Sequence, residues 1–128
     1  MLENKIPAHC LCDLTRGGLA TALVELAESR QVSLNIDERL VSVNHTVRGA
    51  CEFLELDPFY AACEGRMIAI VAPDHATKAL YIMKSFENSA QIIGSVREGP
   101  ASDVIATTLI GTRRTLDRLS GDQLSRIC

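Results

Sequence analysis

Short apolar runs alternate with segments of helical periodicity along this chain, and this alternation restricts the fold more than any other feature. The run RMIAIVA at 66–72 is apolar over the length of one strand, which is typical of a central strand covered on both faces. Alternating or apolar runs predict the other strands at 8–13, 32–37, 90–96 and 103–110. Apolar residues at helical spacing predict helices at 18–30, 44–56 and 73–86. This order predicts an α/β (α+β) domain, a layered α/β/α sandwich with helices packed on a mixed sheet.

Length and polarity predict a single domain that ends in a tail. The chain has 128 residues, 47% of them apolar, which is enough for one core without metals or disulfides. We expect residues 1–110 to form the globular body. From Gly111 the sequence is polar and irregular, so 111–128 are expected to form a flexible C-terminal tail.

Composition argues against several classes of function. A net charge of −3, without a basic stripe, disfavours binding to nucleic acid. No apolar run approaches the ~18 residues that cross a bilayer, and no secretion signal is recognised, so we expect a cytoplasmic protein without membrane contact. The five cysteines are odd in number and lack C-x-x-C spacing, so neither a disulfide framework nor a metal site is expected.

A polar turn rich in glycine separates the first predicted strand from the first predicted helix. Its candidate site residues are Asp13, Thr15, Arg16, Gly17 and Gly18. Backbone N–H groups at a helix N-terminus stabilise phosphate or carboxylate, and an arginine adds a bidentate contact to phosphate oxygens. The alternative is that Thr15 or Asp13 caps the helix and that the glycines allow a tight turn. The turn matches neither a Walker loop nor a dinucleotide fingerprint, so both interpretations stay open.

Glu64 lies in a turn directly before the most apolar predicted strand. A carboxylate at the mouth of a buried strand is partly desolvated, which raises its pKa and suits it to proton transfer. The alternative is an ordinary solvated turn acid beside Arg66.

The cysteines divide into two kinds by position. Strand alternation places Cys10 and Cys12 on one face, where core packing is the expected role. Cys128 is the last residue, so its thiol is expected to be exposed and mobile. A neighbouring cation such as Arg126 favours the nucleophilic thiolate, whereas the α-carboxylate opposes it. The terminal cysteine is therefore either a working nucleophile or an accident of composition.

Five segments together resemble one enzyme family. They are DLTRGGLATALVELA, LDPFYAACEGRMIAIVAP, AQIIGSV, IGTRR and the ending LSGDQLSRIC. In this order they resemble the C-terminal half of HypE, the carbamoyl dehydratase family of nickel-iron hydrogenase maturation, within the PurM-like (aminoimidazole ribonucleotide synthetase) superfamily. The resemblance runs from about Ala8 to Cys128. The D-x-T-R-G-G turn is shared with related ATP-using enzymes, whereas the Arg-Ile-Cys ending is specific to this family.

The resemblance implies a mechanism centred on Cys128. A carbamoyltransferase, HypF, would load a carbamoyl group onto its thiol, and dehydration with ATP and Mg²⁺ would convert this group into a thiocyanate. The cyano group would then pass to iron on a HypC–HypD scaffold. Glu64 matches the family's N-E-G-K turn and would handle protons, while residues 13–18 match the D-P-T-R-G-G turn of the nucleotide region.

The resemblance also sets limits on what this chain is expected to do. Leu14 and Ser125 replace proline of the family pattern, and Cys63 replaces asparagine. Most of the ATP and magnesium site belongs to an N-terminal domain that this chain lacks, so we expect an excised half that is inactive alone and comes from a homodimeric protein. The alternatives are another PurM-like ATP-dependent enzyme, of the selenophosphate synthetase or thiamine phosphate kinase type, and a non-catalytic interaction or dimerisation module.

Overall fold

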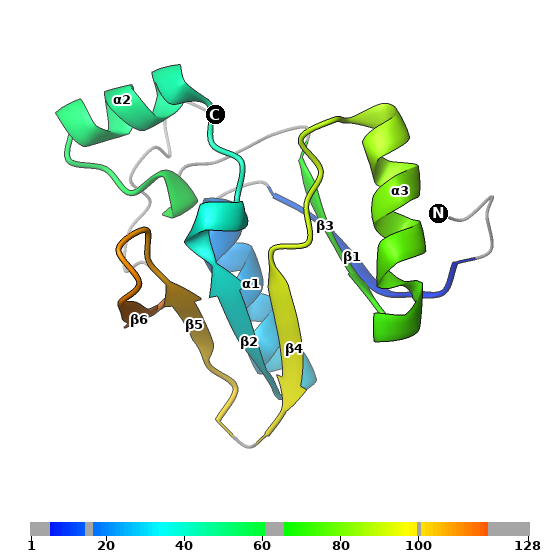
Figure 1. The fold of residues 1–128 in the computed structure, drawn as a ribbon. Helices are drawn as coiled ribbons and strands as arrows, with labels where there is room; N and C mark the ends of the chain where they lie inside the picture. The colour runs from blue at the N-terminus through cyan, green and yellow to red at the C-terminus, as the bar shows by residue number, and fades with distance from the viewer. Residues whose placement is uncertain (1–5, 15–16, 61–65, 100, 118–128) are drawn as a thin grey trace.

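A computed structural model describes residues 6–14, 17–60, 66–99 and 101–117 (Figure 1). The strands are β1 (Ala8–Asp13), β2 (Val32–Asp37), β3 (Met67–Val71), β4 (Gly94–Glu98), β5 (Val104–Thr107) and β6 (Arg113–Thr115). The α-helices are α1 (Gly18–Arg30), α2 (His45–Phe53) and α3 (Ala76–Phe86). Three short 3-10 helices complete the described elements: η1 (Glu38–Leu40), η2 (Pro58–Tyr60) and η3 (Pro73–His75).

The strands form two separate sheets. A four-stranded sheet has the order β4-β2-β5-β6, with β2 parallel to β5 and the other two pairs antiparallel. A second sheet contains only β1 and β3, which pair antiparallel. The predicted class, an α/β domain with a mixed sheet, is confirmed.

The core lies where α1 packs against the four-stranded sheet. Figure 1 shows α1 behind β2 and β4, and α1 contacts both β2 and β5. Leu19, Leu23, Leu26 and Ala27 are buried, as their helical spacing predicts. They meet apolar side chains of β2 and β5, such as Leu34, and form one continuous cluster with them.

Local sequence signals account for the limits of the helices. Asn44 caps α2, because its side-chain oxygen accepts a hydrogen bond from the Thr46 N–H at 2.8 Å. The predicted helix at 73–86 starts instead as the 3-10 turn η3 and continues as α3 from Ala76. Ala79 is the buried residue of α3, and in Figure 1 this helix is drawn on the β1–β3 side of the molecule. No helix of the described segments has the length and apolarity required to cross a membrane.

Two sequence expectations are wrong. The run at 66–72 does form a strand, β3, but among the described strands it pairs with β1 alone and none of the residues of β3 is fully buried, so it is not a central strand. The chain is also not irregular from Gly111. Residues 113–115 form β6, and Leu116 is only 2% exposed, because the Leu116 N–H donates to the Val104 carbonyl at 2.8 Å and its side chain joins the core.

Candidate functional site

The glycine-rich turn ends at two residues that need a left-handed backbone. Gly17 has φ 73° and Gly18 has φ 65°, and both are buried at the start of α1. A Cβ atom at Gly17 would collide with the side chain of Thr21, so this position has no room for any other residue. Thr15 and Arg16 lie outside the described residues.

Of the two residues that the sequence offered as a cap for α1, Asp13 lies within the described residues and Thr15 outside them. Gly17 is the N-cap residue, and among the described residues no side chain accepts a hydrogen bond from this end of the helix. Asp13 lies exposed at the end of β1 and does not cap it. The capping expectation is therefore wrong for Asp13.

Backbone pairing holds the glycine-rich turn beside the start of β3. Asp13 is opposite Met67 in the register of the β1–β3 pair. The next residue, Leu14, donates its N–H to the Arg66 carbonyl at 3.0 Å. Glu64 lies outside the described residues, two positions before Arg66. We call residues 61–65 the Glu64 segment. The hydrogen bond between Leu14 and Arg66 therefore holds the start of the turn next to the residue that follows this segment.

Leu14 occupies the position where the resemblance implies proline. Its side chain is buried in the core, and its N–H makes the hydrogen bond to Arg66. A proline has no N–H and could not make this bond. The departure at Leu14 thus adds a backbone contact between the turn and β3. The other two departures, Cys63 and Ser125, lie outside the described residues.

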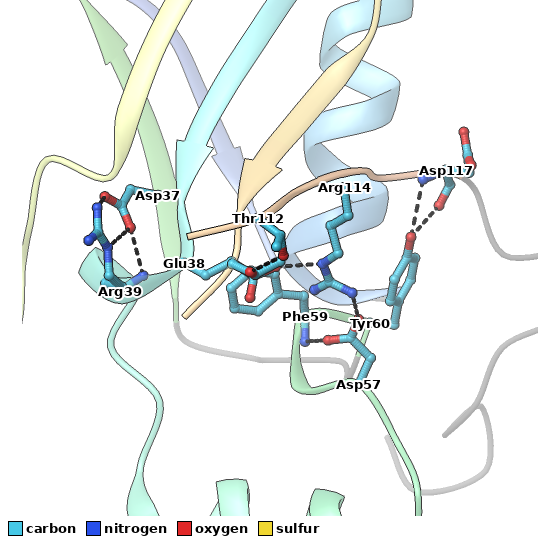
Figure 2. Close-up of polar contacts among 10 residues, drawn as sticks. Asp37, Glu38, Arg39, Asp57, Phe59, Tyr60, Thr112, Arg114 and Asp117 are labelled. Atoms are coloured by element: carbon cyan, nitrogen blue, oxygen red, sulfur yellow. Dashed lines mark hydrogen bonds and ion pairs between the residues drawn. The ribbon is translucent and has the colours of Figure 1, made fainter. Parts of the chain in front are cut away.

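A cluster of ionic groups joins three distant parts of the chain (Figure 2). Arg114 on β6 donates from Nε to Glu38 Oε1 at 2.5 Å and from Nη1 to Asp57 Oδ2 at 2.6 Å. Its guanidinium also lies 5.6 Å from the centroid of the Phe59 ring, within the range of a cation–π contact. We call Arg114, Glu38, Asp57 and Phe59 the Arg114 cluster.

The Arg114 cluster is partly shielded from solvent. The side chain of Arg114 is 37% exposed, and those of Glu38 and Asp57 are 12% and 22% exposed. Burial alone would lower the pKa of Arg114, but the hydrogen bonds that it donates to Asp57 and Glu38, with the charges of these carboxylates, outweigh burial, so this pKa is raised above the usual arginine value. The charge of Arg114 is therefore permanent, and both carboxylates depend on it for compensation.

A second contact joins the same two regions through a tyrosine. The Tyr60 hydroxyl donates to the Asp117 carbonyl at 2.8 Å and accepts from the Asp117 N–H at 3.1 Å. Figure 2 shows the Tyr60 ring pointing toward the backbone of Asp117. We call this pair the Tyr60–Asp117 bridge. Tyr60 is the last described residue before 61–65, and Asp117 is the last before 118–128, which include Cys128.

A small hollow of about 50 Å³ connects the turn with the Arg114 cluster. Leu14, Leu19, Phe59 and Arg66 are among the residues that line it. Arg66 also donates from Nη1 to the Ser42 carbonyl at 2.6 Å. The glycine-rich turn, the segment with Glu64 and the segment with Cys128 are the three predicted site segments. The described residues next to them thus lie in one region of the domain.

The cysteines of β1 have the structural role that alternation predicted. Cys10 and Cys12 lie on one face of the strand and pack against the core. Burial raises the pKa of the Cys12 thiol, and the nearby Cys10, Asp13 and Glu25 raise it further. Cys12 is therefore a poor nucleophile near neutral pH. Within the described ranges, no three His, Cys, Asp or Glu side chains gather closely enough to hold a metal ion.

The family model for the AIR synthase related protein, C-terminal domain, matches residues 1–107. The chain belongs to this family. The AIR synthase-related domain is also 45% identical over its full length to "Carbamoyl dehydratase HypE" of Azotobacter vinelandii, of which it covers 38%. It is 42% identical, again over its full length, to the "Hydrogenase expression/formation protein HupE" of Azotobacter chroococcum mcd 1, and covers 38% of that protein.

Solved structures agree with these matches. The domain superposes on the hydrogenase maturation protein HypE with a TM-score of 0.88 and 40% identity, over 94% of this chain and 40% of the other. A HypE–HypF complex matches with a TM-score of 0.81 and 39% identity, over 88% of this chain and 37% of the other, and HypE has also been solved in complex with ATP. The resemblance to the C-terminal part of HypE is therefore confirmed. The domain spans about two-fifths of the length of these relatives.

Sequence reasoning missed the residues that hold this region together. Tyr60 and Arg114 lie inside the motifs LDPFY and IGTRR, which carry the family resemblance, but no role was predicted for either. Their partners are distant in the chain, 57 residues away for Asp117 and 76 for Glu38. Their presence in the family motifs was the available signal, because local spacing says nothing about such contacts.

Proposed function

We propose that this domain is the C-terminal part of an ATP-dependent carbamoyl dehydratase of nickel-iron hydrogenase maturation, with Cys128 as the carrier of the reacting group. The observation that carries the proposal is the 45% identity, over the whole chain, to a relative named carbamoyl dehydratase HypE. The domain supplies the carrier thiol and part of the pocket. The remainder of the nucleotide site and Mg²⁺ would belong to the N-terminal part that such relatives carry.

The reaction begins with a carbamoyl group on the Cys128 sulfur, as R–S–C(=O)–NH₂. ATP supplies the phosphoryl group that turns the carbamoyl oxygen into a leaving group. Formation of the S–C≡N product then breaks the C–O bond, releases phosphate and removes both N–H protons. We assign the acceptance of these protons to Glu64, whose carboxylate is the base that this segment offers.

The polar turn contributes to binding rather than to proton transfer. We assign Asp13, Thr15, Arg16, Gly17 and Gly18 to the nucleotide and phosphate region. The left-handed Gly17 supports this assignment, and so does the lack of a side-chain cap on α1 among the described residues, because both leave backbone N–H groups for an anion.

The contacts at Tyr60 support a carrier in the C-terminal segment. Cys128 is the eleventh residue after Asp117, so its tether spans at most ~36–40 Å when extended. Glu64 is the fourth residue after Tyr60, whose hydroxyl bonds Asp117. A sulfur on this tether can therefore reach the Glu64 segment and also leave for partner proteins.

The partners follow from the same chemistry. The carbamoyl group would come from a HypF-type carbamoyltransferase, and a solved HypE–HypF complex supports this assignment. The cyano group would pass to iron on a HypC–HypD scaffold. We expect the full-length protein to be a homodimer that acts in the cytoplasm, where thiols stay reduced.

The test is mass analysis of the C-terminal peptide in the full-length protein. Incubation with the carbamoyltransferase, carbamoyl phosphate and ATP should add one carboxamide to Cys128 and then remove the elements of water from it. The Cys128→Ser variant should show neither change, whereas Cys10→Ser should behave as the unmodified protein. Carbamoylation at another residue, or full hydrogenase maturation with Cys128→Ser, would contradict the proposal.

A further inference from the structure

The Tyr60–Asp117 bridge joins the two residues that directly precede the segments with proposed roles, 61–65 with Glu64 and 118–128 with Cys128. The Tyr60 hydroxyl makes two hydrogen bonds to the backbone of Asp117, one to its carbonyl and one from its N–H. Because these contacts involve backbone atoms of Asp117, the tyrosine fixes the position of the main chain there and does not depend on the Asp117 side chain. Tyr60 itself is buried in the core cluster, which makes it a firm support.

The Arg114 cluster also connects the region of Tyr60 with the region of Asp117. Arg114 lies three residues before Asp117, and Asp57 three residues before Tyr60. The ion pair between Arg114 and Asp57, at 2.6 Å, therefore links the same two chain segments as the Tyr60–Asp117 bridge. Asp57 also accepts from the Phe59 N–H at 3.0 Å, which fixes the short turn that presents Tyr60. Two independent contacts thus hold this junction.

We propose that Tyr60 and Arg114 are positioning residues of the dehydration step, which fix the start of the C-terminal segment beside the start of the Glu64 segment. This inference rests on the proposed function. The carrier thiol has to leave for a transferase and then return to its own pocket, so its tether needs a fixed origin near that pocket. Holding the origin favours return within the same molecule, because the reacting groups start close and oriented.

Loading and dehydration both use the Cys128 thiol but differ in their dependence on the bridge. Loading by the transferase takes place between two proteins, so it depends on access to the thiol and not on where its tether begins. Dehydration takes place within one molecule, so it depends on the bridge. Loss of the bridge should therefore lower kcat for dehydration and leave both loading and the KM for ATP unchanged.

The principal variant is Tyr60→Phe in the full-length protein, with Tyr81→Phe as its matched control. Tyr81 is the other tyrosine of the chain, is largely exposed on α3, and loses the same single oxygen atom. A misplacement of about 1 Å can cost up to about 100-fold in rate. We expect Tyr60→Phe to lower kcat for dehydration on the order of tenfold, with loading unchanged, and Tyr81→Phe to change neither.

A second measurement separates positioning from damage to the pocket. In a Cys128→Ser background, a synthetic peptide of residues 119–128, carboxamidated on its thiol, is supplied as a separate substrate. Because this peptide does not use the bridge, Tyr60→Phe should leave its kcat/KM unchanged. Arg114→Met should lower the intramolecular rate in the same direction as Tyr60→Phe and also spare the peptide.

The outcomes are distinct for the two proposals. Equal intramolecular rates for Tyr60→Phe and the unmodified protein would overturn the positioning role. Equal losses with the tethered and the separate substrate would also overturn it, since Tyr60 would then support the pocket itself. If the unmodified protein neither loads nor dehydrates a carbamoyl group, the proposed function fails whatever the variants do.

Discussion

The hydroxyl of Tyr60 and the backbone of Asp117 form a reciprocal pair of hydrogen bonds, at 2.8 and 3.1 Å, across 57 residues of sequence. The ring of Tyr60 belongs to the core, whereas Asp117 is exposed. A buried side chain thus fixes the backbone of an exposed residue, the last one described before 118–128. This relationship links the packing of the domain to the proposed handling of a tethered thiol.

Removal of the Tyr60 hydroxyl should release the backbone of Asp117. We expect Tyr60→Phe to lower the free energy of unfolding by about 0.5–1.5 kcal/mol, because hydrogen bonds to a partly buried group are lost while the ring is retained. The Asp117 amide should also exchange with solvent faster, as measured by hydrogen exchange and mass spectrometry. Tyr81→Phe should change neither quantity, and an unchanged Asp117 amide in Tyr60→Phe would contradict the bridge.

Arg114 should contribute to stability through the two carboxylates that it compensates. Arg114→Met leaves Glu38 and Asp57 close together without their cation. We expect a loss of about 1–3 kcal/mol in urea unfolding, less than for a fully buried ion pair because Arg114 is about one-third exposed. Arg113→Met is the matched control, since Arg113 is exposed on the same strand, and should change stability by less than about 0.5 kcal/mol.

Gly17 should tolerate no side chain. Gly17→Ala combines a left-handed backbone with a collision against Thr21, so we expect a loss of about 1–3 kcal/mol in the free energy of unfolding. Gly49→Ala is the matched control, because Gly49 lies within α2 with open space around its Cβ position. This control should raise stability by up to about 1 kcal/mol through helix propensity. Equal effects of the two changes would contradict the strain at Gly17.

Local sequence signals predicted the positions of helices and strands better than they predicted which strands pair. Leu19 and Leu23 of α1 are buried as helical spacing predicts, but Ala20, Ala22 and Val24, which lie outside that stripe, are buried as well. The apolar run that forms β3 was correctly predicted as a strand, but apolarity does not reveal how many neighbours a strand has. Strand β6 has the sequence Arg-Arg-Thr, without an apolar signal, and forms through its pairing with β5.

The candidate site was predictable only in part, for a related reason. The turn that ends at Gly17 was recognised from its glycines, since a left-handed backbone leaves a mark in the sequence. The Tyr60–Asp117 bridge leaves no such mark, because its contacts at Asp117 are backbone atoms that every residue type except proline carries. The pairing of Arg114 with Glu38 and Asp57 likewise depends on tertiary structure. Such contacts become visible only after the chain has folded.

Leu14 should resist replacement by the proline that the family pattern implies. Leu14→Pro removes the N–H that bonds the Arg66 carbonyl and part of a buried side chain. We expect a loss of about 2–4 kcal/mol in the free energy of unfolding, despite the stiffer unfolded chain that proline provides. Leu14→Met keeps the N–H and most of the volume, so it should cost less than about 1.5 kcal/mol. A stabilised Leu14→Pro variant would show that the hydrogen bond contributes little.

Cys12 should react slowly with alkylating reagents in the folded protein. Burial, followed by the charges of Cys10, Asp13 and Glu25, raises its pKa, so at pH 8.5 a smaller fraction is thiolate than in an unfolded chain. Peptide mapping after iodoacetamide treatment should show the pH midpoint of its reaction shifted upward relative to denaturant. Because the folded pKa lies above the unfolded one, the linked stability is fully present below the unfolded pKa and is lost as pH rises through the folded value. Replacing Cys12 by alanine should remove this loss of stability at high pH. An identical reaction midpoint in the folded and the denatured protein would contradict a raised pKa of Cys12.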